Sequence, residues 1–152
     1  LKISFQNQRY SCCRCYWPRQ LCAAYVLAME ELIDGMLRST RSGFFAEIAW
    51  DQAGLLAAQS AMRAVDRRFY APAGVDRPYA SICHTIGSNG YERVTMSKPV
   101  VHAFFLHELW RWLQDHPTDA DEASRGSAVD VLDVGSGTGY LTVALARLLQ
   151  QA

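Results

Sequence analysis

The chain has 152 residues, half of them hydrophobic and a fifth charged, a composition that suits one globular domain with an ordinary core. Fifteen basic side chains cancel fifteen acidic ones, which excludes a global electrostatic attraction to nucleic acid or to membrane surfaces. No apolar run is long enough to span a bilayer. We predict a cytoplasmic, monomeric protein without nucleic-acid or membrane partners.

The first 29 residues differ from the rest because they contain basic residues and no acidic one. Most of the cysteines also lie here, namely Cys12, Cys13, Cys15 and Cys22. This composition is compatible with a mitochondrial leader, but Trp17-Pro18 would interrupt the helix of such a leader. A zinc site is disfavoured because the cysteines lack paired Cys-x-x-Cys spacing. We therefore predict that residues 1–29 form a disordered extension and that the chain binds no metal.

Residues 51–65 show the pattern of a scaffold helix. Leu55, Ala58, Met62 and Val65 recur at helical spacing, and Asp51 is placed to cap the helix at its N-terminus. The dipeptide Asp66-Arg67 follows the helix. We interpret it as a structural charge pair, which contributes little to stability where it is exposed.

Residues 94–103 have the sequence Val-Thr-Met-Ser-Lys-Pro-Val-Val-His-Ala and lead into an apolar helix. Ser97 is placed to cap that helix, and Pro99 suits the first turn because a nitrogen there has no intrahelical partner. His102 has many apolar neighbours, so it is either a hydrogen-bonded core group or a ligand contact. The acidic run after this helix lacks the features of a calcium loop, and we predict a polar linker at residues 115–127.

Residues 129–150 combine a strand, a glycine-rich turn and a helix. Residues 129–134 form a nearly continuous apolar run, which is typical of a buried parallel strand, and leucines recur at helical spacing after Tyr140. Between them lies Gly-Ser-Gly-Thr-Gly, whose third glycine comes one residue too early for a dinucleotide fingerprint. Asp133 directly before the turn would attract a cationic ligand group and repel a phosphate. The loop therefore suits a cofactor without a pyrophosphate.

These motifs, in this order, resemble the protein-L-isoaspartate (D-aspartate) O-methyltransferase family over roughly residues 30–150. The glycine loop resembles the first motif of class I S-adenosylmethionine-dependent methyltransferases, whereas Thr-Met-Ser-Lys-Pro at 95–99 resembles a motif that generic methyltransferases lack. Residues 31–45 and 65–87 are similar to the opening helix and the next segment of the family. The chain departs from the family at Ser88 to Val94, where the usual connection is tighter.

The resemblance implies an α/β fold in which N-terminal helices lead into a Rossmann-like class I methyltransferase sheet. The sequence supplies only the first strand, loop and helix of that sheet, so we expect the sheet to be truncated after them. Residues 30–152 would form the N-terminal portion of the methyltransferase domain, with the cofactor motif at 129–150. We interpret the chain as a fragment or a truncated gene model, and we expect the isolated chain to be inactive.

The implied reaction is methylation of the free carboxylate of L-isoaspartyl and D-aspartyl residues in damaged proteins, which initiates repair. S-adenosyl-L-methionine is the implied cofactor, and Ser97 is the implied catalytic residue, with its hydroxyl donating to the substrate carboxylate. The implied cofactor contacts are Val94, Thr95, Met96, Ser97, His102, Asp133, Gly135, Ser136, Gly137 and Gly139. Two alternatives remain open: a non-catalytic module that binds peptides, and another class I methyltransferase that shares only the glycine loop.

Overall fold

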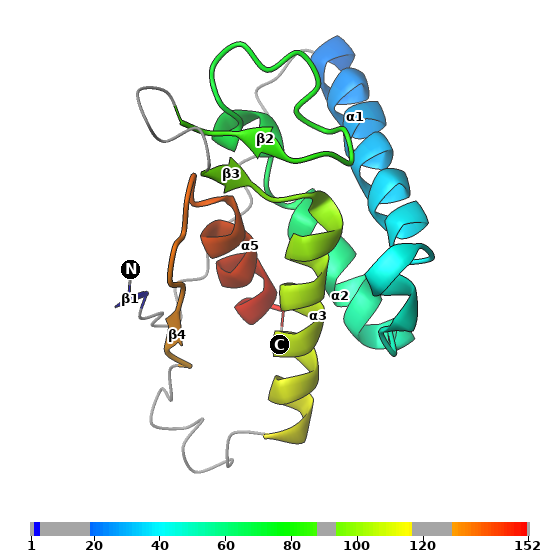
Figure 1. Ribbon diagram of the computed structural model, residues 1–152, viewed down its shortest axis with the longest axis vertical. Coiled ribbons are helices and arrows are strands. Elements are labelled where there is room, and N and C mark those ends of the chain that lie inside the picture. Colours follow the sequence, from blue (N-terminus) through cyan, green and yellow to red (C-terminus); the bar gives the residue numbers. More distant parts are fainter. Residues whose placement is uncertain (1, 4–18, 88–93, 117–128, 152) are drawn as a thin grey trace.

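The computed structural model describes residues 2–3, 19–87, 94–116 and 129–151 (Figure 1). The helical elements are α1 (Arg19–Ser39), η1 (Gly43–Glu47), α2 (Gln52–Arg63), η2 (Arg67–Tyr70), α3 (Pro99–Asp115) and α5 (Tyr140–Leu149), where η marks a 3-10 helix. The strands are β1 (Lys2–Ile3), β2 (His84–Thr85), β3 (Thr95–Met96) and β4 (Val131–Leu132). The described part is thus a mixed fold of helices and short strands.

The strands form two small antiparallel sheets, in which β1 pairs with β4 and β2 pairs with β3. The predicted buried strand at residues 129–134 is therefore wrong in length, because only Val131 and Leu132 pair with another strand. Their partner β1 is antiparallel, and the side chain of Leu132 is 68% exposed. Among the described residues β4 has no parallel neighbour that would cover it.

Helix α1 begins at Arg19, inside the region that was predicted to be a disordered extension. The first turns contain glutamine, leucine and alanines, which favour helix, and Pro18 precedes them in the sequence. The boundary predicted at residue 29 therefore does not mark the start of folded structure. Cys12, Cys13 and Cys15 lie outside the described residues, as do most of the predicted linker and the connection at 88–93.

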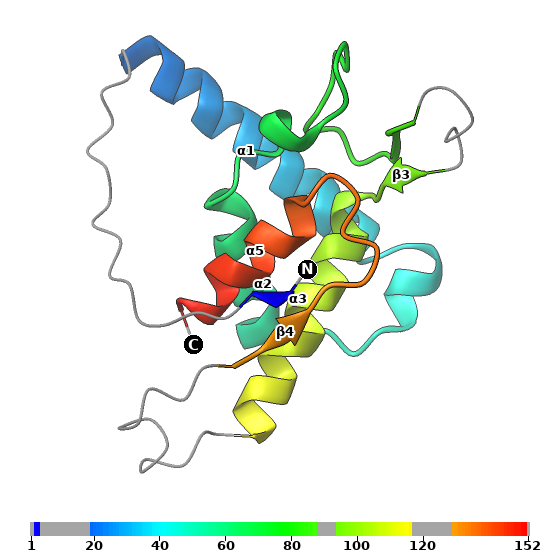
Figure 2. The same cartoon turned by 90° about the vertical axis from the view of Figure 1, so that its left-hand side faces the viewer.

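The hydrophobic core lies where α1, α2, α3 and α5 meet (Figures 1 and 2). Its fully buried members include Leu32, Met36, Ala58, Met62, Ala103, Leu106, Ala144 and Leu148. Fully burying a leucine or methionine side chain stabilises the fold by about 1.5–3 kcal/mol. The predicted buried face of α2 is confirmed by Ala58 and Met62, and Asp51 caps this helix by accepting from the Gly54 N–H at 2.7 Å. No helix in the described ranges is long and apolar enough to cross a membrane.

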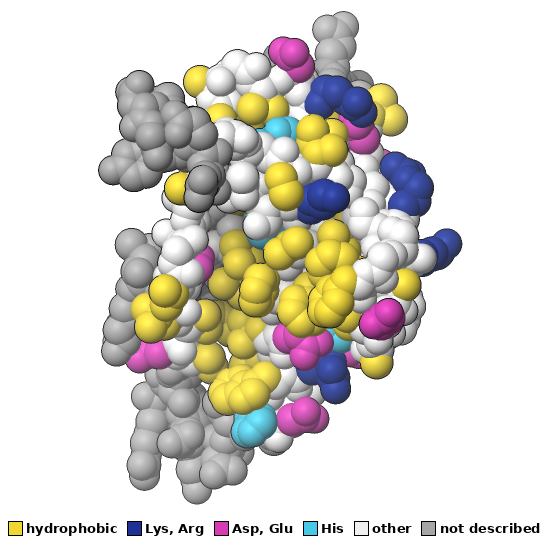
Figure 3. All heavy atoms as spheres, viewed as in Figure 1, with side chains coloured by type: hydrophobic (Ala, Val, Ile, Leu, Met, Phe, Trp, Pro, Cys, Tyr) yellow, Lys and Arg dark blue, Asp and Glu magenta, His cyan; other side chains and the backbone are white. Residues whose placement is uncertain are grey.

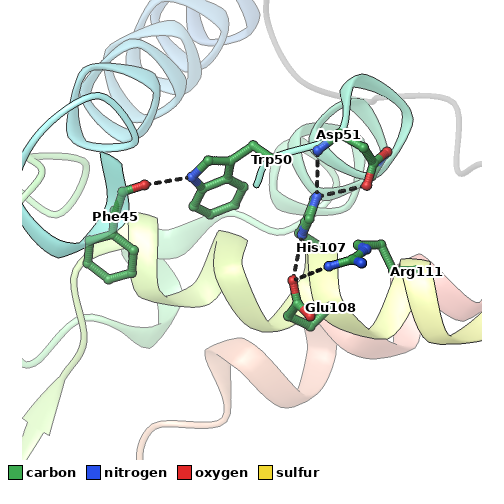
Figure 4. A network of polar contacts seen from close by, with 7 residues as sticks. Phe45, Trp50, Asp51, His107, Glu108 and Arg111 are labelled. Carbon is green, nitrogen blue, oxygen red and sulfur yellow. Dashed lines mark hydrogen bonds and ion pairs between the residues drawn. The ribbon is translucent and has the colours of Figure 1, made fainter. Parts of the chain in front are cut away.

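A buried histidine joins α3 to the start of α2 (Figure 4). His107 is fully buried, and its Nε2 accepts from the Asp51 backbone N–H at 3.0 Å. The same Nε2 lies 2.9 Å from the Asp51 carboxylate oxygen Oδ2, and Nδ1 on the other side of the ring lies 3.0 Å from Glu108 Oε1. Trp50 lies against the ring and donates from its indole nitrogen to the Phe45 carbonyl at 2.8 Å. This network fixes the angle at which α2 and α3 meet.

The tight contact at His107 makes Gly54 intolerant of a side chain. A Cβ at this position would lie 2.7 Å from His107 Cδ2 and 2.9 Å from Asp51 Oδ2. Alanine normally favours a helix over glycine, but we expect Gly54→Ala to lower the free energy of unfolding by about 1–3 kcal/mol, since the histidine must move. Urea denaturation measures this change.

The exposed Gln52 in the same turn provides the control. We expect Gln52→Ala to change the free energy of unfolding by less than about 0.5 kcal/mol. A stable Gly54→Ala variant would show that His107 can move aside at no cost.

Candidate functional site

A cavity of about 410 Å³ lies between two parts of the chain that are distant in sequence. One wall consists of β3 and the first half of α3, and the other consists of β4, the glycine loop and the start of α5. The polar lining residues are Thr95, Ser97, His102, Asp133, Ser136, Thr138 and Tyr140, and the apolar ones include Val101, Phe105, Leu109, Leu141 and Leu145. In the orientation of Figure 1, hydrophobic side chains gather along the middle of the face that is turned to the viewer (Figure 3).

Most of the predicted site residues line this cavity. They are Thr95, Met96, Ser97, His102, Asp133, Gly135, Ser136 and Gly137. The other two lie outside the lining. Val94 is exposed and its carbonyl accepts from the Ile86 N–H, while Gly139 directly precedes α5. The structure thus brings the serine motif and the glycine loop together, although the roles assigned to these residues stay predictions.

Ser97 does not cap α3, so that sequence-based interpretation is wrong. Pro99 is the first helical residue, which leaves Lys98 in the cap position, with no capping bond from its side chain. The physical reason is that a proline disfavours helical angles in the residue before it, and Lys98 is accordingly extended, with φ −56° and ψ 149°. The half-buried side chain of Ser97 lines the cavity instead.

The glycine loop presents bare backbone to the cavity. Gly135, Gly137 and Gly139 have φ angles of 79°, 54° and 83°, a region that other residues rarely adopt. A Cβ at Gly135 or Gly139 would meet no atom within 4 Å. Glycine is therefore needed here for its backbone conformation rather than for tight packing, and the space beside the loop is open.

Asp133 is held by the helix that follows the loop. The hydroxyl of Thr142, which is only 4% exposed, donates a short hydrogen bond to Oδ2 of Asp133. This bond fixes the carboxylate at the end of β4. Because Asp133 lines the cavity, its other oxygen can accept from a ligand.

Arg67 is the residue of this region that sequence reasoning missed. The predicted pair with Asp66 is wrong, because Asp66 bonds to Arg68 at 2.9 Å and accepts from Tyr79 Oη at 2.6 Å. Arg67 is instead fully buried. The sequence Asp66-Arg67-Arg68 contains one carboxylate and two guanidinium groups. It could therefore have indicated that one of the two arginines has no local ion-pair partner.

The guanidinium of Arg67 is satisfied by neutral groups. It donates from Nε to the Pro78 carbonyl at 2.9 Å, from Nη2 to the Ser97 carbonyl at 2.8 Å, and from Nη1 to His102 Nδ1 at 3.1 Å. Its central carbon lies 5.1 Å from the centroid of the Tyr140 ring, which is a cation–π distance. Burial lowers the pKa of Arg67 to about 10, so the group is still charged at neutral pH.

His102 is a neutral imidazole in this arrangement. Burial, and secondarily the charge of Arg67, lowers the pKa of His102 to about 3. A guanidinium can only donate, so Nδ1 of His102 is the acceptor and the ring proton is on Nε2. Among the described residues, no group of three or more metal-ligating side chains is close enough to hold an ion.

One of the comparisons with known proteins covers all the predicted site residues. The model of a family described as Protein-L-isoaspartate(D-aspartate) O-methyltransferase (PCMT) matches residues 54–152, a range that includes every predicted site residue. A Caenorhabditis elegans protein named Protein-L-isoaspartate O-methyltransferase is 37% identical over 120 residues, which are 79% of this chain and 40% of that protein. The chain thus spans about two fifths of the length of this curated relative. No solved structure matches the chain.

The bond between Thr142 and Asp133 gives a testable prediction about the site. We expect Thr142→Val to lower the free energy of unfolding by about 1–3 kcal/mol, because a half-buried carboxylate loses its fixed donor. Thr142→Ser keeps the hydroxyl and is expected to retain most of the stability. Urea denaturation of both variants makes the comparison, and equal losses would indicate that the methyl group, rather than the hydrogen bond, stabilises this turn.

Proposed function

Because the chain belongs to the protein-L-isoaspartate(D-aspartate) O-methyltransferase family, we propose that its protein methylates the free carboxylate of L-isoaspartyl and D-aspartyl residues, using S-adenosyl-L-methionine. The observation that supports this most is that residues 95–97 and 133–137 line one cavity. In the methyl ester, the backbone amide nitrogen of the next residue can attack the ester carbonyl and expel methanol, which gives a succinimide. Hydrolysis of the succinimide by water then gives normal aspartate in part. The reaction would therefore start a repair cycle.

The charges around the cavity fit a cationic cofactor. Among the described residues that line it there is no lysine or arginine, its histidine is neutral, and Asp133 supplies a carboxylate. The open space beside Gly135 leaves room for a ligand against the backbone. In this proposal, S-adenosyl-L-methionine when bound supplies an activated methyl group on a sulfonium. Asp133 would accept from its ammonium group, and the glycine backbone would lie against its amino-acid portion.

The residues of the chain would position the carboxylate rather than move a proton. A peptide α-carboxyl has a pKa near ~3.5, so the nucleophile is already ionised at neutral pH and needs no general base. The hydroxyl of Ser97 is free to donate to one carboxylate oxygen, because it does not cap α3. Val101 and Phe105 make the adjoining surface apolar, which excludes water and favours reaction by proximity and orientation.

We further propose that β4, the glycine loop and α5 are the first strand, loop and helix of a Rossmann-like sheet. Two observations support this topology. The helix starts directly after the glycine loop, as it does in cofactor-binding α/β units. The side chains of Leu132 and Val134 are 68% and 84% exposed, as expected of a strand that is built to be covered.

A methyl-transfer assay tests the proposed reaction. Two peptides that differ only in one L-isoaspartyl or L-aspartyl residue are incubated with methyl-labelled S-adenosyl-L-methionine. The assay uses the isolated chain, which we expect to be inactive, and a graft in which it replaces the aligned 120 residues of the worm relative. We expect the graft to label the isoaspartyl peptide alone, and label on both peptides or on neither would overturn the proposal.

The same assay tests Ser97. We expect Ser97→Ala in the graft to lower kcat/KM for the isoaspartyl peptide by about 100-fold, because one hydrogen-bond donor to the reacting carboxylate is lost. The exposed Ser60 on α2 provides the matched control, and Ser60→Ala is expected to leave kcat/KM unchanged. A Ser97→Ala variant with full activity would remove this residue from the mechanism.

A further inference from the structure

Arg67 lies behind the cavity and contacts residues of both its walls. Three of the groups around its guanidinium, on Ser97, His102 and Tyr140, belong to residues that line the cavity, whereas Arg67 itself does not. Ser97 and His102 lie on the wall that contains α3. Tyr140 directly follows the glycine loop on the opposite wall. One buried side chain therefore connects the two halves of the candidate site.

The bond to Ser97 fixes the direction of its side chain. The Ser97 carbonyl belongs to the peptide group that joins Ser97 to Lys98, so the guanidinium holds the plane of that peptide. Pro99 restricts the backbone angles of Lys98, the residue on the other side of that peptide. With the peptide held at both ends, the Cα–Cβ bond of Ser97 keeps one direction relative to the cavity.

The bond to His102 decides which hydrogen-bonding group that ring offers to a ligand. With Nδ1 occupied as an acceptor, the remaining group is the Nε2–H donor. The titratable groups that face the ring are Arg67 from η2 and Tyr140 from α5, whose ring centroid lies 5.0 Å away. Burial raises the pKa of Tyr140, so this neighbour is uncharged and does not favour an imidazolium.

We propose that Arg67 is the positioning residue of this site, which holds the Ser97 turn in one orientation and keeps His102 as a neutral donor through Nε2. The geometry of four hydrogen-bonding or ring contacts from separate segments supports this role. Only the identity of the ligand rests on the function proposed above. The positioning of Ser97 and His102 is a property of the chain itself.

The first experiment needs no ligand. Nitrogen-15 NMR of the full 152-residue chain reports which ring nitrogen of each histidine carries the proton. We expect His102 to carry it on Nε2 and to show no titration between about pH 5 and 8, because burial lowers its pKa to about 3. A proton on Nδ1 of His102, or titration within that range, would overturn the proposal. This measurement on the unmodified chain remains decisive even where a variant fails to fold.

The second experiment compares Arg67→Met and Arg67→Lys with the control Arg68→Met. Arg68 is the adjacent residue, but its side chain is 51% exposed and pairs with Asp66. Lysine keeps the charge but lacks the planar fork, so it cannot hold all three acceptors at once. We expect both Arg67 variants to shift the NMR signals of Ser97 and His102, and Arg68→Met to leave them unchanged.

S-adenosyl-L-methionine is then titrated into the graft on the worm relative, which carries each substitution in turn, and binding is followed by the same signals. We expect Arg67→Met to weaken binding by at least about tenfold, Arg67→Lys to be intermediate, and Arg68→Met to stay within about twofold. Binding by the Arg67→Met graft equal to that of the graft without it, with the signals of Ser97 and His102 unmoved, would overturn the inference. If the graft without substitutions shows no binding, the proposed cofactor fails, and the His102 tautomer alone decides the role of Arg67.

Discussion

The candidate site depends on the burial of one guanidinium charge. Removing such a charge from water costs several kcal/mol, and the cost is offset only where fixed acceptors meet the N–H groups. Arg67 finds these acceptors at Pro78, Ser97 and His102, while Tyr140 covers the cation from α5. The N–H groups of the guanidinium are therefore all hydrogen-bonded only when these segments have come together. The contacts that stabilise this region are thus the same contacts that shape the cavity.

The charge of Arg67 makes the two sides of the cavity electrostatically different. Arg67 has no carboxylate partner among the described residues, and it lies directly behind the Ser97 turn. Asp133 lies across the cavity at the end of β4. An anionic group is thus favoured near the Ser97 turn and a cationic group near Asp133. In the proposed reaction, the carboxylate acceptor and the sulfonium donor would have these opposite charges, so the field of the protein would help to orient both ligands.

Features that depend on neighbouring residues were predictable from the sequence. The cap at Asp51 and the buried face of α2 follow from a few consecutive residues, and both are confirmed. The glycine loop is equally local, because alternate glycines indicate positive φ angles. The cap at Ser97 was wrong because a stronger local rule applied, since Pro99 set the first helical residue and moved the cap position to Lys98.

The features that could not be predicted from the sequence depend on contacts between distant segments of the chain. The apolar run at 129–134 predicted a long buried strand, but strand length depends on partners, and only β1 pairs with it in the described residues. Arg67 next to Asp66 has the pattern of an exposed ion pair, because its acceptors at 78, 97 and 102 are not its sequence neighbours. An excess of guanidinium groups over carboxylates in a short segment can nevertheless be recognised in the sequence. The arginine without a local carboxylate must either reach solvent or find neutral acceptors, and the second case requires a folded site around it.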